Sequence, residues 1–269
     1  MSSPSAEEAK FARQQLMAGC DTMEHFLHGL LDSKGRVAEE VHACRKLGKS
    51  LRGGFSLFRL GESSAKEIQA VGRLLSSPRD AVSRLNTWHK LGWNDDDDSA
   101  AAAIGALLVQ QTHSAARRPP PETIAWCVER VAAARKNLQN LSEDSLAERV
   151  EVGLKKLRKQ LGKRFGKIER AGEEDFHNAR KALKAYLGAL GFMPNESFSS
   201  DPEMTELADV LGDENDLGTL SAWLEARGFT EHFVPGLWEK LTKSRGKLRK
   251  EAINDAGRVI STDEQRPGS

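Results

Sequence analysis

The chain has 269 residues, 39% of them hydrophobic, which is enough to bury a sizeable core as one domain or as two similar halves. Its 40 Lys and Arg residues nearly balance its 39 Asp and Glu residues, so the chain as a whole has no preference for polyanions. No apolar run approaches the roughly 20 residues that span a bilayer, and the N-terminal residues lack the pattern of a signal peptide. We therefore expect a cytoplasmic protein with no membrane partner.

The composition favours helix throughout. The chain has only 9 prolines and a single tyrosine, and it is rich in Ala, Leu, Lys, Arg and Glu, whose side chains lose little rotamer freedom in a helix. We predict an all-α fold with almost no β-sheet. The cysteines are odd in number and far apart, which fits neither a disulfide framework nor a metal site, so we interpret Cys20, Cys44 and Cys127 as small buried hydrophobic residues.

Helix-breaking residues divide the chain into segments. Residues 95–99 cap a predicted helix at 100–112, the prolines at 119–121 start another, and residues 141–145 separate two halves. We predict one helical repeat over residues 7–141, a second over 146–260, and disordered ends at 1–6 and 261–269. The acidic run 196–216 contains Pro202 and Gly212, and we expect a loop there.

The two halves share a motif, H-x-x-R-K-x-x-K, which runs from His42 to Lys49 and from His177 to Lys184. Asp80 follows the first histidine by 38 residues and Asp216 follows the second by 39, and we place each at the start of the next helix. Near-equal spacing indicates an internal duplication. It predicts a pseudo-twofold arrangement in which the two histidine helices face one another.

Each motif places its basic residues on one helical face. Side chains three, four and seven positions apart share a face, next to a neighbouring apolar face that packs. The first stripe contains His42, Arg45, Lys46, Lys49 and Arg52, and the second contains His177, Arg180, Lys181 and Lys184. Like charges on a stripe repel each other and no carboxylate on either stripe compensates, so both stripes suit an anionic ligand.

Two further segments are basic. Residues 155–170 hold eight basic residues and one acidic residue, and residues 240–250 hold six basic residues. Helical spacing puts Lys156, Lys159, Lys163 and Lys167 on one face, and Lys240, Lys243, Lys247 and Lys250 on another. If these helices converge with the histidine helices, they line a channel that binds a linear polyphosphate. The alternative for each segment is a solvated helix face.

The duplicated motif resembles the CHAD (conserved histidine α-helical domain) family, over about Phe11 to Val259. In that family a His-x-x-Arg helix precedes a helix opening with Arg-Asp; here the second pair is Arg79-Asp80 in one half and Asn215-Asp216 in the other. The resemblance implies two four-helix-bundle repeats with pseudo-twofold symmetry around a basic central cavity. It also implies binding of inorganic polyphosphate and association with polyphosphate granules. Departures from the family pattern are Ser50, Ala185, Leu187 and Asn215.

The two basic stripes, the two basic segments and the CHAD resemblance together indicate the candidate polyphosphate-binding residues. They are His42, Arg45, Lys46, Lys49, Arg52, Arg79, Lys156, Lys159, Lys163, His177, Arg180, Lys181, Lys184, Lys240, Lys243 and Lys247. We expect no catalytic residue, no metal and no cofactor.

Three other functions stay open. One is a metal-dependent phosphohydrolase, or an accessory domain of phosphate metabolism, that uses His42 and His177; no cluster of carboxylates on the basic stripes supports it, and the sequence has no Walker-type glycine loop. Another is nucleic-acid binding, which near-neutral net charge and the lack of aromatic residues among the basic ones argue against. The last is a purely structural helical protein.

Overall fold

The computed structural model describes residues 3–32, 37–93, 99–115, 118–168, 172–194 and 202–264. Within these ranges the chain forms ten α-helices and one 3-10 turn, with no strand, so the all-α prediction is confirmed. The elements are α1 (Ala6–Asp32), α2 (Val37–Leu57), α3 (Ser64–Leu74), α4 (Ser76–Leu91), α5 (Ser99–Ala115), α6 (Pro121–Gln139), η1 (Glu143–Ser145), α7 (Leu146–Phe165), α8 (Glu173–Leu190), α10 (Pro202–Glu225) and α11 (Pro235–Glu264).

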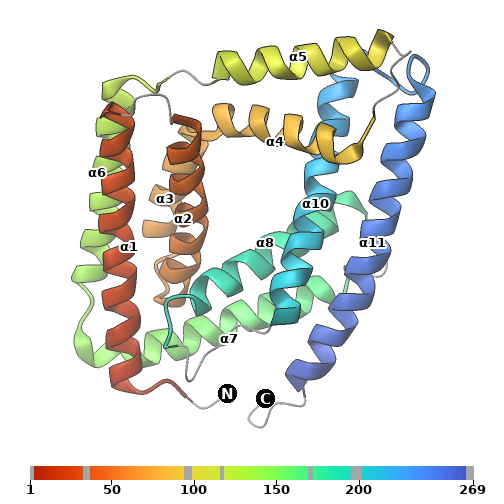
Figure 1. Cartoon of the computed structure of the whole chain (residues 1–269). Coiled ribbons are helices and arrows are strands. Elements are labelled where there is room, and N and C mark those ends of the chain that lie inside the picture. The colour runs from red at the N-terminus through yellow and green to blue at the C-terminus, as the bar shows by residue number, and fades with distance from the viewer. Residues whose placement is uncertain are drawn as a thin grey trace.

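The helices are arranged as the sides of a frame (Figure 1). On the left of that view α1, α2, α3 and α6 run side by side, and α4 and α5 lie along the top. On the right α10 packs against α11, and α7 and α8 form the base. The two histidine helices, α2 and α8, meet where the left side joins the base, and they pack on each other more extensively than any other described pair.

Two hydrophobic cores hold the frame together, and each combines helices from both predicted repeats. The larger core joins α1, α2, α3 and α6 to α7 and α8, through side chains that include Leu16, Leu51, Leu138, Leu157 and Leu183. The smaller core joins α4 and α5 to α10 and α11, through Trp88, Ile104, Leu220 and Leu237. The two halves of the sequence therefore interlock, because burial of apolar surface is shared between them. The three cysteines are buried, as predicted.

The acidic segment expected to be a loop is a helix. Helix α10 begins at Pro202 and runs without a break through Gly212 to Glu225. It buries Leu207, Leu211, Leu217, Leu220 and Leu224 along its length. This tertiary packing outweighs the low helix propensity of one glycine. Asp216 therefore lies in the middle of α10 and not at the start of a helix.

The histidine helices cross through direct backbone contact at two glycines. A Cβ added at Gly53 would lie 2.5 Å from Ala185 O and 2.7 Å from Ala189 N, and one added at Gly188 would lie 3.0 Å from Ser50 Cα. Each glycine lies eleven residues after the histidine of its helix, so the contact joins equivalent positions of the two motifs. Only glycine permits so close an approach of two helices. The crossing brings the basic faces of α2 and α8 together.

Helix α11 continues to Glu264, past Ile260, where the second repeat was expected to end. The expectation of disorder for residues 1–2 and 265–269 lies outside the described residues. None of the described helices combines the length and the apolar character needed to cross a membrane.

Candidate anion-binding site

A pocket of about 520 Å³ opens beside the crossing of α2 and α8. Seven basic residues line it, and they come from three helices and from the turn that follows α2: Lys49, Arg52, Arg59, Lys156, Arg180, Lys181 and Lys184. Glu62 is its only acidic lining residue among the described residues. The lining thus has a formal charge of about +6, whereas the whole chain has +1. A confined excess of positive charge makes the local electrostatic potential positive and attracts anions.

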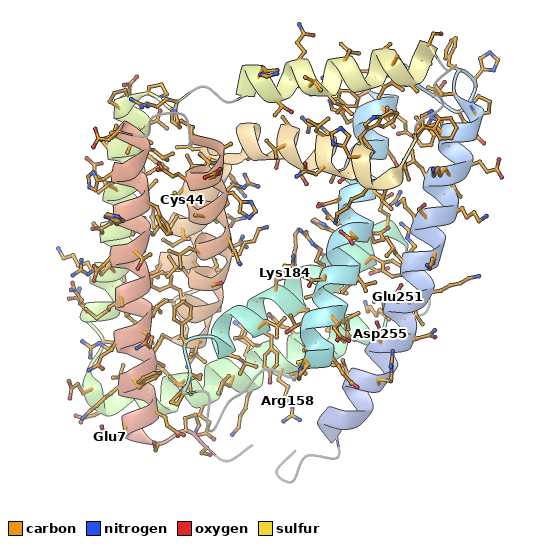
Figure 2. The ribbon with its side chains drawn as sticks, viewed as in Figure 1. Glu7, Cys44, Arg158, Lys184, Glu251 and Asp255 are labelled. Carbon is orange, nitrogen blue, oxygen red and sulfur yellow. The ribbon has the colours of Figure 1, made fainter. Side chains whose placement is uncertain are left out.

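Helical periodicity explains why these residues meet. On α2, Leu51 and Phe55 point into the larger core while Lys49 and Arg52 occupy the adjacent face that borders the pocket. Helix α8 does the same, burying Leu183 and turning its basic residues to the pocket. Lys184 projects from α8 towards the inside of the frame, whereas Arg158 projects from α7 to the outside (Figure 2). Lys184 Nζ lies 3.7 Å from where a Cβ would stand at Gly212, so this glycine of α10 leaves room for the lysine.

The single carboxylate of the pocket is already paired. Glu62 accepts a hydrogen bond from Lys66 at 2.6 Å, and this bond, together with the charges of Lys66 and Lys156, lowers its pKa. Partial desolvation of the Arg52 guanidinium by the protein around it, and then the charge of Arg73, lower its pKa below the ordinary value. An arginine remains cationic despite such a decrease. The pocket therefore keeps its positive charge at neutral pH, and an anionic ligand would reduce the repulsion among its basic side chains.

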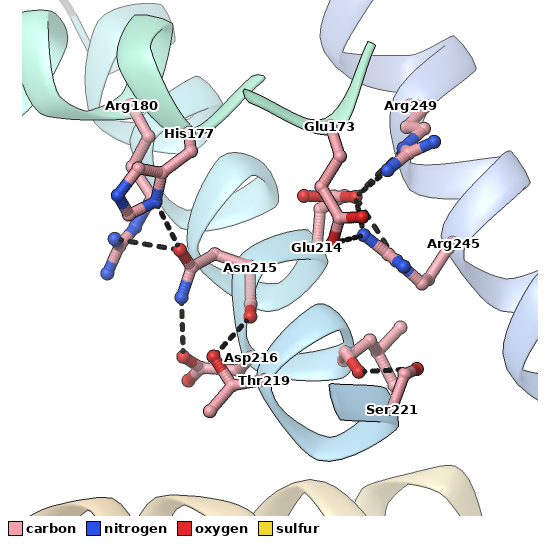
Figure 3. A network of polar contacts seen from close by, with 11 residues as sticks. Glu173, His177, Arg180, Glu214, Asn215, Asp216, Thr219, Ser221, Arg245 and Arg249 are labelled. Atoms are coloured by element: carbon pink, nitrogen blue, oxygen red, sulfur yellow. Dashed lines mark hydrogen bonds and ion pairs between the residues drawn. The ribbon is translucent and has the colours of Figure 1, made fainter. Parts of the chain in front are cut away.

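A polar network fixes the start of α8 against α10 (Figure 3). Oδ1 of Asn215 lies 2.8 Å from His177 Nδ1 and accepts a hydrogen bond from Arg180 Nη1 at 3.2 Å. Nδ2 of Asn215 donates to Asp216 at 3.4 Å, and Asp216 also accepts from Ser83 of α4 at 3.1 Å. His177 and Arg180 are therefore oriented by one amide, which an aspartate in turn orients.

The first half has the matching contact, and it corrects the alignment of the two motifs. Arg45 donates to Gly72 O at 3.1 Å and contacts Asp80 at 3.4 Å. Asp80 follows Arg45 by 35 residues, and Asn215 follows Arg180 by the same 35. By this contact Asn215, and not Asp216, takes the place of Asp80, and Glu214 takes the place of Arg79. The spacings of 38 and 39 residues from His42 to Asp80 and from His177 to Asp216 differ by one because Asp216 is not the equivalent of Asp80. From His177 to Asn215 the spacing is also 38 residues.

Glu214 is the centre of a second cluster that sequence analysis missed. Its carboxylate is buried and contacts Arg245 at 2.9 Å and Arg249 at 2.8 Å, both from α11. Arg245 also contacts Glu173, at the start of α8, at 2.6 Å (Figure 3). These ion pairs outweigh the effect of burial and raise the pKa of Arg245. Helix α11 thus ties α8 to α10, and so holds His177 opposite Asn215.

The structure divides the candidate residues into two groups. Six of them line the pocket: Lys49, Arg52, Lys156, Arg180, Lys181 and Lys184. The remaining side chains are not part of its lining: His42, Arg45, Lys46, Lys159, Lys163, His177, Lys240, Lys243 and Lys247. The side chain of Arg79 lies outside the described residues. Arg59 was not among the candidates, although it follows Arg52 by seven residues and so continues the spacing of the first stripe. Helix α2 ends at Leu57, and the turn after it brings Arg59 to the pocket.

The lysines of α11 do not converge on the pocket. Lys243 and Lys247 are exposed, and each lies two residues from Arg245, so they project from the opposite side of α11. With Lys250 they border a separate shallow groove on this helix. Lys240 donates to Gly92 O at 2.8 Å, with its ammonium 5.9 Å from the centre of the Trp93 ring.

No group of three or more potential metal ligands comes together among the described residues. What these observations define is an all-α protein in which two crossing histidine helices border a basic pocket. Residues 15–225 match the family model of the CHAD domain, and the chain belongs to this family.

Solved structures have the same fold. One is the crystal structure of the CHAD domain from the plant Ricinus communis, with 19% sequence identity, a TM-score of 0.65, and coverage of 100% of this chain and 90% of that one. Another is PptA from Streptomyces chartreusis, with 15% identity, a TM-score of 0.55, and coverage of 96% and 99%. A comparison with curated proteins finds no match.

Proposed function

We propose that this protein binds inorganic polyphosphate in the pocket between α2 and α8. The observation that carries the proposal is the concentration of seven cationic side chains and one paired carboxylate around about 520 Å³. Lysine offers an adaptable point charge to phosphate and arginine a rigid two-pronged donor. Many such donors around one pocket suit a flexible polyanion that carries a charge on every unit. The CHAD resemblance implies the same ligand.

The lining argues against two other functions. Nucleic acids are held by basic grooves combined with aromatic side chains on which bases stack, and no aromatic residue lines the described pocket. Metal-dependent phosphoryl transfer recruits magnesium through carboxylates, and the one carboxylate here is paired with Lys66. Both observations favour binding over base recognition or catalysis. The resemblance to CHAD proteins leads us to propose that binding serves association with polyphosphate granules.

The test is calorimetric titration of the full chain with long-chain polyphosphate. Because cationic side chains displace counterions from the ligand, the affinity should fall by about tenfold or more between about 50 mM and about 200 mM salt. Single-stranded RNA of equal phosphate number should compete weakly. A phosphate-release assay with added magnesium should detect no turnover. Absence of polyphosphate binding at low salt would overturn the proposal, and phosphate release would favour the enzyme alternative.

A further inference from the structure

The turn after α2 holds Arg59 in a left-handed backbone conformation, with φ of 61°. The backbone N–H of Arg59 donates to Ser56 O at 3.1 Å, and that of Leu60 donates to Phe55 O at 2.8 Å. These two bonds form a Schellman motif, in which the left-handed position is usually glycine. Among the described residues Arg59 is the one non-glycine residue at positive φ.

The end of α10 shows the same motif with the expected residue. Gly228 has φ of 79° and donates to Glu225 O at 3.0 Å, while Phe229 donates to Leu224 O at 3.1 Å. At that helix end glycine adopts the conformation without steric cost. Arginine at the equivalent position of α2 is strained, because its Cβ crowds the backbone. The geometry of the turn therefore does not account for an arginine there.

Contacts within the fold do not account for it either. The side chain of Arg59 is exposed, and across the described ranges no hydrogen bond or ion pair engages its guanidinium. The nearby carboxylate, Glu62, is already held by Lys66. What distinguishes the position is that Arg59 lines the basic pocket together with Arg52 and Lys156. Strained residues at ligand sites commonly trade stability for the placement of a side chain.

We infer that Arg59 is a phosphate-binding residue of the pocket, and that the strained turn exists to present its guanidinium to the ligand. This inference rests on the proposed function. It predicts an inverse relation between stability and binding at a single position. Replacement by glycine should relieve the strain and also remove a charged, two-pronged donor.

The experiment compares Arg59→Gly, Arg59→Ala and Arg59→Lys with the wild type by thermal unfolding and by titration with long-chain polyphosphate. Arg59→Gly should raise the melting temperature by about 2 °C and weaken binding by about tenfold. Arg59→Ala should weaken binding to the same degree without the gain in stability, since alanine retains the strain. Arg59→Lys should retain most of the affinity, because it keeps the charge.

Two controls isolate the effect. Gly228→Arg introduces the same strain away from the pocket, and no neighbouring atom lies within 4 Å of its Cβ, so it should lower the melting temperature and leave binding unchanged. Lys250→Ala removes one charge from the outer face of α11 and should change the affinity by less than about twofold. If the wild type binds and Arg59→Gly binds equally well, the role of Arg59 is refuted while the proposed function stands. If the wild type does not bind, the proposed function itself fails.

Discussion

Replacing Gly53 by alanine tests whether the backbone contact of the two histidine helices holds the fold and the pocket. The new Cβ would lie 2.5 Å from Ala185 O and 2.7 Å from Ala189 N, where 3.4–4 Å is ordinary contact. Both neighbours are backbone atoms, so the helices must separate by about 1 Å at the crossing. Overpacking of this kind costs about 1–3 kcal/mol. Greater helix propensity returns about 0.5–1 kcal/mol, which leaves a net loss of about 1 kcal/mol in the free energy of unfolding.

Equilibrium unfolding in urea measures this loss directly. The control is Gly162→Ala in α7, where nothing lies within 4 Å of the added Cβ, so the propensity gain of about 0.5–1 kcal/mol should appear alone. Polyphosphate affinity should fall in Gly53→Ala, because Lys49 and Arg52 move away from the basic residues of α8. If Gly53→Ala proved as stable as Gly162→Ala, the reasoning about the crossing would be wrong.

Four further predictions concern the contacts around the site and the buried cysteines. Glu214→Ala should destabilise the fold by about 3 kcal/mol in urea unfolding, because it leaves two half-buried arginines without their shared partner. Loss of the exposed Asp213–Lys90 pair should cost less than about 1 kcal/mol. Equal losses of stability in the two variants would contradict the role of Glu214. Nitrogen NMR should find His177 protonated on Nδ1, since the Asn215 oxygen accepts there, and Asp216→Ala should reduce that preference. Burial raises the pKa of Cys20 and Cys44 to about 12 and of Cys127 to about 11, so a thiol reagent at pH 8 should label none of the three in the native protein and all of them in denaturant. Since the unfolded thiols ionise near 9.0 and the folded ones only above that, stability should fall as the pH rises from about 9 towards 12.

The sequence was sufficient for the fold class and for most of the basic residues that line the candidate pocket. Helix-forming composition and the spacing of the basic residues are local properties, and they located Lys49, Arg52, Arg180, Lys181 and Lys184, all of which line the pocket. The same reasoning misread residues 202–216 as a loop. The packing of α10 on two cores decides that segment, and packing is not a local property.

The remainder of the site depends on how helices meet. Lys240, Lys243 and Lys247 have the same periodicity as the pocket lysines, and only the pairing of Arg245 and Arg249 with Glu214 shows which side of α11 faces inward. Arg59 continues the seven-residue spacing from Arg52, but α2 ends at Leu57, so a turn and not the helix places its side chain. Gly53 and Gly188 mark the crossing only once two helices are known to touch.

The location of the binding site is tested most directly by removing three positive charges from the pocket in one variant and three from the outer face of α11 in another. The first variant combines Arg52→Ala, Lys156→Ala and Lys181→Ala, which removes three exposed cations from three helices around the pocket. The second combines Lys243→Ala, Lys247→Ala and Lys250→Ala, which removes the same charge from the outer face of α11. In titrations with long-chain polyphosphate, the first variant should lose about a hundredfold or more in affinity, and the second should bind nearly as the wild type does. Equal losses in both variants, or a greater loss in the second, would contradict a binding site between α2 and α8.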